Sequence, residues 1–87
     1  MNLSLRHKEE YDYGSESSDV EAGHVFRCPH NGPVVETARV IGVRTDSYGI
    51  PHVTYEVRIR RANHDVQDGP RMLALKSFAQ RYPERVH

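Results

Sequence analysis

The sequence predicts a mainly β fold, a small antiparallel barrel or curled sheet of about four or five strands that ends in a short C-terminal helix. Apolar side chains occupy every second position of residues 52–60, the period that places them all on one face of a half-buried strand. Two β candidates precede this segment. A turn-forming cluster at 29–33 separates them from each other, and a second cluster at 45–51 separates them from residues 52–60. At 87 residues the chain forms one domain at most, with a modest core.

The charge is distributed unevenly along the chain. Residues 1–21 carry two basic and six acidic side chains, a net charge of −4, whereas residues 22–87 carry ten basic and six acidic ones, a net charge of +4. The N-terminal part is rich in Ser, Asp and Glu and poor in large apolar residues, which favours disorder. We therefore predict a disordered acidic tail over residues 1–22, a β domain over 23–83 and a C-terminal tail over 84–87.

Two strands are expected before the regular one. Residues 24–28 form a short β candidate, and the Pro/Asn/Gly cluster at 29–33 ends it. Residues 34–43 form the second, which is rich in Val, Ile and Thr. The loop at 45–51 contains the Asp, Ser and Gly that suit a chain reversal.

The second of these strands contains a change of face. Ala38 and Val40 fall on one face, whereas Ile41 and Val43 fall on the other. Gly42 lies where this switch requires a bend or a bulge, and glycine tolerates one.

Beyond the strand at 52–60 the pattern weakens. Residues 62–70 are polar and predict a loop with a turn at Asp68-Gly69. Residues 71–75 predict a further strand, with alternate leucines facing inward.

A short helix is predicted over residues 77–82. Ser77 suits its N-cap, Phe78 and Tyr82 share one face, and Pro83 can end it. The predicted core collects the inward-facing apolar residues of all these elements: Val25, Val40, Val43, Val53, Tyr55, Val57, Ile59, Leu73, Leu75, Phe78 and Tyr82.

Four hydrophobic patterns span residues 23–82: Gly23-x-Val25-Phe26, Ala38-x-Val40-x-x-Val43, Val53-x-Tyr55-x-Val57 and Arg71-x-Leu73-x-Leu75-x-x-Phe78. Together they resemble the SH3-like and Tudor-like small barrels, including uncharacterised bacterial domains of this type. The resemblance implies a binding role toward nucleic acid, peptides or modified side chains. Recognition of a methylated ligand would need several aromatic residues around an acid. Here there is no Trp, and Tyr55 is expected to point inward.

Residue types that carry chemistry are sparse. In an extended segment His24, Cys28 and His30 share a face, but structural zinc takes four ligands, usually in pairs, and no second pair exists. No helix N-terminus or oxyanion signature accompanies Cys28, and the six glycines form no phosphate-binding loop. We predict no metal, no cofactor and no enzymatic activity.

The location is expected to be cytoplasmic. No apolar run approaches the ~20 residues that span a bilayer, and the first residues lack the apolar stretch of a signal peptide. A single cysteine cannot form an intrachain disulfide, which favours a reducing compartment. We expect no membrane partner, and a monomer is the default oligomeric state.

A protein partner is the predicted ligand class. Tyr48, Ile50 and Pro51 form the most apolar segment expected at the surface, in the loop before the main strand. Small barrels also leave short edges open, to which an extended peptide can add as a strand. These features predict a non-catalytic interaction module. The simpler interpretation is a loop that tucks Ile50 into the core.

Nucleic-acid binding is the alternative. If the strands pair as a meander, several arginines gather on one solvent-facing surface: Arg39, Arg44, Arg58, Arg60, Arg61 and Arg71. Such a surface can contact phosphates while Tyr48 stacks on a base, and the acidic tail would compete for it. The charged outer face of an ordinary antiparallel sheet explains the same pattern.

Overall fold

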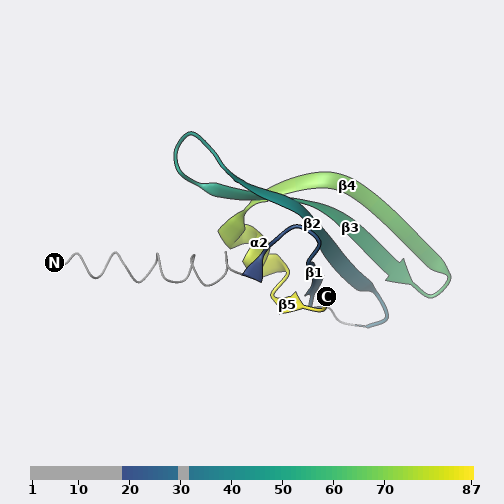
Figure 1. Cartoon of the computed structure of the whole chain (residues 1–87). Coiled ribbons are helices and arrows are strands. Elements are labelled where there is room, and N and C mark those ends of the chain that lie inside the picture. The colour runs from purple at the N-terminus through teal and green to yellow at the C-terminus, as the bar shows by residue number, and fades with distance from the viewer. Residues whose placement is uncertain (1–18, 30–31) are drawn as a thin grey trace.

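The computed structural model describes residues 19–29 and 32–87, so the predicted disorder of the tail falls, up to residue 18, outside the described residues. The described chain forms strands and one short helix (Figure 1). In order these are β1 (Val25–Cys28), β2 (Val35–Thr45), β3 (Pro51–Arg61), β4 (His64–Ala74), α2 (Leu75–Arg81) and β5 (Glu84–Arg85). The predicted mainly β class with a short C-terminal helix is confirmed.

All five strands pair antiparallel in one sheet, in the order β4-β3-β2-β1-β5. Neighbours along the chain are neighbours in the sheet from β1 to β4, and α2 then carries the chain across to place β5 beyond β1 (Figure 1). The two outermost strands, β4 and β5, do not pair, so the sheet is open over the described residues. Of the two forms predicted, the open sheet is correct and the closed barrel is wrong.

β3 lies between β2 and β4 and supplies the middle of the core. Its residues Val53, Tyr55 and Val57 are almost fully buried, and Ile59 packs against the same cluster from the margin. The period-two pattern therefore predicted both the strand and the face that it buries.

The short helix α2 covers one face of the sheet. The ring of Phe78 lies 5.6 Å from that of Phe26 in β1, and 5.1 Å from those of Tyr55 and Tyr82. Aromatic side chains bury large areas, so this cluster accounts for much of the core. We call the face covered by α2 the helix side of the sheet, and the opposite face its open face.

Two predicted core residues are placed wrongly. Val25 alternates with the buried Phe26 and therefore points to the open face. Val43 pairs with Val53 on the helix side but is 38% exposed, because it lies on the outer part of the β2–β3 hairpin. The prediction also missed three buried residues: Val20, Phe26 and Ala38.

A β-bulge lies where Gly42 predicted one. The β2–β3 register pairs Val40 with Tyr55 and Gly42 with Thr54, so Ile41 is the extra residue. A bulge reverses the alternation beyond it, which returns Val43 to the helix side.

The polar stretch 62–70 is mostly strand, and the predicted loop is wrong. Only Ala62 and Asn63 form the turn, and β4 begins at His64. Ala62 adopts a positive φ of 45°, as tight two-residue hairpin turns require at a central position. Val66 is the sole large apolar residue of the stretch, so pairing with β3 rather than burial makes it a strand.

The predicted reversal at Asp68-Gly69 is a second bulge. The β3–β4 register pairs Tyr55 with Arg71 and Val57 with Asp68, which sets two residues of β4 opposite one of β3. Gly69 has a φ of 131°, and a Cβ there would lie 3.2 Å from the backbone of β3. Only glycine fits this position without displacing the neighbouring strand.

The helix begins two residues earlier than predicted. Ala74 occupies its N-cap position without a side-chain hydrogen bond, so Ser77 is not the cap. Leu75 and Phe78 are buried one turn apart, which indicates that burial of Leu75 sets the start. In the part of the chain described here, no helix has the length and apolarity to cross a membrane.

Residues 84–87, predicted as a tail, return to the sheet. β5 pairs with β1, and Arg27 and Glu84 form an ion pair of 2.6 Å. Beyond β5, the Val86 N–H donates to the Val25 carbonyl at 2.8 Å, and the Val25 N–H donates to the His87 carbonyl at 2.9 Å. These bonds attach the chain end to β1.

Candidate functional site

The outer half of β2 has an uncovered edge. β1 pairs with β2 only as far as Arg39, and Val40 then bonds to the backbone of Gly23 and His24 at 2.9 Å. From Ile41 to Thr45, no strand of the described residues lies beside β2 on its outer side. We call residues 41–45 the free β2 edge; it belongs to the β2–β3 hairpin that projects past α2 (Figure 1).

The hairpin fixes which backbone groups this edge presents. The Asp46 N–H donates to the Ile50 carbonyl at 3.0 Å, so these two residues form a hydrogen-bonded pair. Bonded and non-bonded pairs alternate along an antiparallel ladder. The N–H and C=O groups of Val43 and Thr45 therefore point outward, away from β3.

The hairpin tip is held by one carboxylate. Asp46 accepts hydrogen bonds from the backbone N–H groups of Tyr48 at 2.8 Å and Ile50 at 2.9 Å. The bond from Ile50 is the first cause that lowers the pKa of Asp46. The tip therefore has a defined shape, and it presents the Tyr48 side chain 88% exposed.

Four large apolar side chains of this hairpin are exposed, and we call them the arm patch: Ile41, Val43, Tyr48 and Ile50. Of the predicted partner surface, Tyr48 and Ile50 lie in this patch, and Pro51 is half-buried at the start of β3. Ile50 is not tucked into the core. Sequence reasoning missed Ile41 and Val43, because their exposure depends on where β1 ends.

The six predicted arginines do not share one face. Arg39, Arg44, Arg58 and Arg60 fall on the open face by the β2–β3 register. Arg71 pairs with the buried Tyr55 on the helix side, and Arg61 falls on that side by alternation. The bulge at Gly69 decides the placement of Arg71.

Carboxylates occupy part of the open face. Arg39 pairs with Glu56 at 2.5 Å, and Arg58 pairs with Asp65 at 2.6 Å. The hydrogen bond from Arg58 is the first cause that lowers the pKa of Asp65. Two of the four predicted arginines that lie on this face are therefore paired with acids of the same face.

A groove of about 410 Å³ crosses the open face. Its lining mixes arginine, neutral polar and apolar side chains from β1 to β4 and the chain end, among them Thr37, Arg39, Arg58, Arg60, Gln67 and Val86. Glu56 also lines the groove, so its charge is mixed rather than uniformly positive.

The cluster considered for metal is only partly described. The Nδ1 atom of His24 lies 2.6 Å from the Asp19 carbonyl, the thiol of Cys28 donates to the Pro29 carbonyl at 3.5 Å, and His30 lies outside the described residues. Within 19–29 and 32–87, no group of three His, Cys, Asp or Glu side chains has the arrangement to hold a metal ion.

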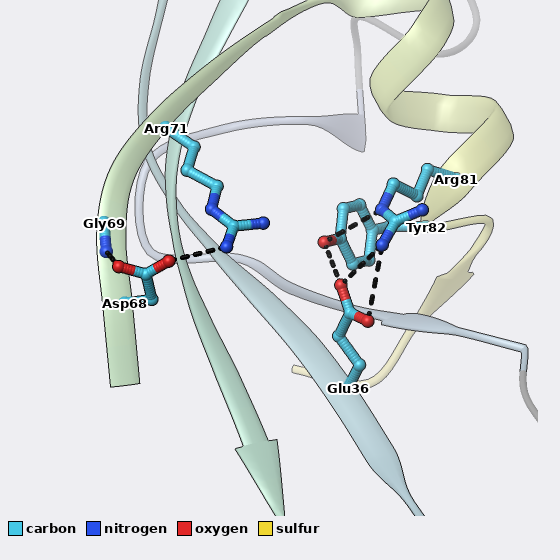
Figure 2. A network of polar contacts seen from close by, with 6 residues as sticks. All are labelled: Glu36, Asp68, Gly69, Arg71, Arg81 and Tyr82. Atoms are coloured by element: carbon cyan, nitrogen blue, oxygen red, sulfur yellow. Dashed lines mark hydrogen bonds and ion pairs between the residues drawn. The ribbon is translucent and has the colours of Figure 1, made fainter. Parts of the chain in front are cut away.

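A polar network on the helix side links α2 to β2 (Figure 2). The Tyr82 hydroxyl donates to Glu36 at 2.5 Å, and Arg81 donates to the same carboxylate at 3.1 Å. Burial first, and then the bond to Glu36, raise the pKa of Tyr82. Glu36 alternates with the inward Ala38, and this spacing is the sequence signal that marks it as an inward-facing acid.

Comparisons of the chain with protein-family models, with curated proteins and with solved structures find no match. The geometry of these surfaces therefore carries the functional argument.

Proposed function

We propose that the protein is a non-catalytic interaction module that binds an extended segment of a partner protein along the free β2 edge. One observation carries the proposal: outward backbone groups that pair with no strand of residues 19–29 or 32–87 run beside the exposed arm patch. An added strand would satisfy those groups, and its alternate side chains would reach the patch.

The other long edge of the sheet suits an added strand less well. Pro70 removes one backbone donor from β4, the bulge at Gly69 interrupts its regular spacing, and Asp65 and Asp68 add charge. These are the features with which proteins keep an edge strand from pairing. The free β2 edge has no proline and no acid, and Arg44 is its single charge.

The arm patch supplies the apolar part of the interface. Tyrosine is enriched among the residues that dominate binding energy, and Tyr48 projects from a loop whose shape Asp46 fixes. A loop ordered before binding loses little conformational entropy on binding. Tyr48 is therefore the expected anchor of the interface.

The charge of the edge indicates the partner's chemistry. Arg44 lies across the ladder from His52 on the open face. We propose an extended partner segment with alternating apolar residues and an acid placed against Arg44, because opposite charges fix register and suppress wrong partners.

An SH3-like identity is part of this proposal. A meander of four antiparallel strands followed by a short helix and a fifth strand beside the first supports it. The open sheet would then be a barrel that does not close, with the free edge of β2 at its rim.

The protein partner is favoured over nucleic acid by the pairing of arginines. Phosphate binding draws on cationic side chains that are free to replace counterions. On the open face, acids hold Arg39 and Arg58. A generic oligonucleotide at low salt is the direct check, and tight, strongly salt-dependent binding would favour the alternative.

The test is peptide selection against the whole chain, followed by mapping. Random linear peptides displayed on phage are selected on the wild type, and the enriched peptides are titrated while amide chemical shifts are followed. Tyr48→Ala removes the anchor. Thr45→Pro removes an outward N–H and leaves the ladder with β3 intact, whereas Thr45→Ala keeps that N–H and serves as the matched control.

The expected result is enriched peptides with alternating apolar residues, whose shifts centre on residues 41–50. Tyr48→Ala and Thr45→Pro should weaken them at least tenfold, equivalent to about 1.4 kcal/mol. Thr45→Ala should bind as the wild type does. Enrichment of no peptide, or peptides that map to the open-face groove, would overturn the proposal.

A further inference from the structure

Two opposite charges flank Thr45, the last residue of the free β2 edge. Arg44 precedes it and Asp46 follows it, and all three residues are exposed. The register pairs Arg44 with His52, and the Asp46 Oδ2 atom lies 3.7 Å from the Nδ1 atom of His52. Both charges therefore lie on the open face of the sheet.

Arg44 can find a closer acid on an added strand than on its own. It takes part in none of the ion pairs between residues of 19–29 and 32–87. Side chains two residues apart along one strand are separated by about 7 Å, whereas side chains directly opposite on paired strands are about 4.5–5.5 Å apart. An acid opposite Arg44 therefore interacts with it more strongly than Asp46 of the same strand does.

Asp46 can serve as that acid for another chain. It accepts both hydrogen bonds of the hairpin tip through Oδ1, from the backbone N–H groups of Tyr48 and Ile50. The second oxygen, Oδ2, is the one that lies toward the open face, near His52. Oδ2 can therefore accept from an arginine while the tip keeps its shape.

A second copy of the chain presents the same two charges in the reverse order when its edge runs antiparallel. In a two-fold interface, residue i contacts residue j and residue j contacts residue i. With the axis at Thr45, Arg44 of each copy lies directly opposite Asp46 of the other. The outward N–H and C=O groups of Thr45 then bond to the C=O and N–H groups of Thr45 of the second copy, as a hydrogen-bonded pair.

Two other two-fold registers pair outward residues of this edge, and each meets an obstacle. An axis at Arg44 places this arginine opposite its own copy, and like charges directly opposite are destabilising. An axis at Val43 brings the hairpin tip of the second copy level with Val40, where the backbone of residues 23–24 already bonds to β2 at 2.9 Å. The axis at Thr45 avoids this backbone and pairs opposite charges.

We propose that the free β2 edge associates with the same edge of a second copy, antiparallel about Thr45. The inference rests on the proposed function in one respect, that the edge accepts an added strand. The second copy offers what the proposed partner segment offers, an acid against Arg44 and apolar residues at alternate positions, Ile41 and Val43. Self-association therefore competes with partner binding, and a partner segment must displace the second copy.

The dimer is expected to be weak, because the interface is small. It joins residues 43–47 of the two copies, whereas stable complexes contribute about 20–30 residues a side. Small interfaces are typical of transient complexes. We therefore expect a monomer at about 10 µM and a reversible dimer with a Kd of about 0.1–1 mM.

Sedimentation equilibrium of the full chain at pH 7, from about 10 µM to about 1 mM, measures the association. Arg44→Gln should weaken it about fivefold, because it removes both symmetry-related ion pairs. Asp46→Asn should weaken it similarly and keeps an oxygen for the tip bonds. Arg60→Gln is the matched control: it changes an exposed arginine of the open face on β3 and should leave the dimer unchanged. Added salt should weaken the wild-type dimer, since the ion pairs are exposed.

Disulfide trapping locates the axis. In a Cys28→Ala background, Thr45→Cys sets two Cα atoms about 5.5 Å apart across the axis, within the range of a disulfide. Val43→Cys is the matched control, because it lies on the same edge but about 13 Å from its own copy. With oxidised glutathione as the oxidant, Thr45→Cys should form a covalent dimer at least about tenfold faster than Val43→Cys.

A monomer at every concentration up to about 1 mM would overturn the proposal. A tighter dimer for Arg44→Gln, or faster trapping of Val43→Cys, would also overturn it. Peptide titrations at about 10 µM test the proposed function separately, on the monomer. A chain that binds selected peptides but never dimerises refutes self-association alone, whereas a dimer centred on Thr45 without any selected peptide refutes only the partner function. An enriched peptide should dissociate the dimer, and a dimer that persists at saturating peptide would refute their competition.

Discussion

Tyr82→Phe tests how much the network between α2 and β2 contributes to stability. The change removes one oxygen from a side chain that is 1% exposed and leaves the packing of the ring on Phe78 in place. It deletes the 2.5 Å bond to Glu36 and the long 3.3 Å contact from Arg81. A hydrogen bond to a charged group contributes about 1.5–3 kcal/mol. Because Glu36 keeps Arg81 as a partner, we expect a loss of about 2 kcal/mol.

Urea unfolding measures this loss. With an m value of about 1–2 kcal/mol/M for a small domain, the midpoint should fall by about 1–2 M at unchanged m. Raising the pH gives an independent check. The folded-state pKa of Tyr82 is raised above 10.0, so its stabilisation is complete below pH 10.0 and is lost as the pH rises beyond it. Tyr82→Phe should flatten that alkaline decline. A loss below about 0.5 kcal/mol would refute the reasoning, since exposed surface changes fall in that range.

Three further changes test the backbone and the hairpin tip. Gly69→Ala should lose about 1–3 kcal/mol in thermal unfolding, because its φ is 131°, and wild-type stability would contradict the bulge geometry. Ala62→Gly should raise the free energy of unfolding by about 0.5–1 kcal/mol, because Ala62 has a φ of 45°. The same change at the single alanine of α2 should lower the free energy of unfolding by about 1 kcal/mol. Equal effects of the two changes would rule out the turn geometry. The pKa of Asp46 is lowered from 3.8, first by the bond from Ile50, so its stabilisation is present above pH 3.8 and is lost below it. Asp46→Asn should make acid unfolding less steep, and an unchanged acid limb would count against the tip structure.

The sequence predicted the elements whose burial it encodes. The alternation of Val53, Tyr55 and Val57 indicates a strand with one inward face, and Gly42 indicated the first bulge. The first half of β4 shows no such pattern, because its side chains are exposed and its strand form depends on pairing with β3. Periodicity cannot detect a strand that buries nothing.

The candidate surfaces were only partly predictable for a related reason. Tyr48 and Ile50 stood out as apolar residues in a loop, and they are exposed. The exposure of Val43 depends on the pairing of β1 ending beside Arg39. This pairing is part of the tertiary structure, and no local sequence pattern predicts where it ends. One extra residue at Gly69 likewise decides which face carries Arg71.

The one-sided cover that α2 gives the sheet implies that resistance to opening varies along the β3–β4 hairpin. Val53, Tyr55 and Val57 lie in the core, whereas residues 60–66, which surround the turn, are all exposed. Local fluctuations need to break only solvent-exposed hydrogen bonds near the turn, but must dismantle the aromatic cluster near Tyr55. Amide protons around Ala62 should therefore exchange with deuterium within the native state, while the amide of Tyr55 exchanges only when the whole domain unfolds.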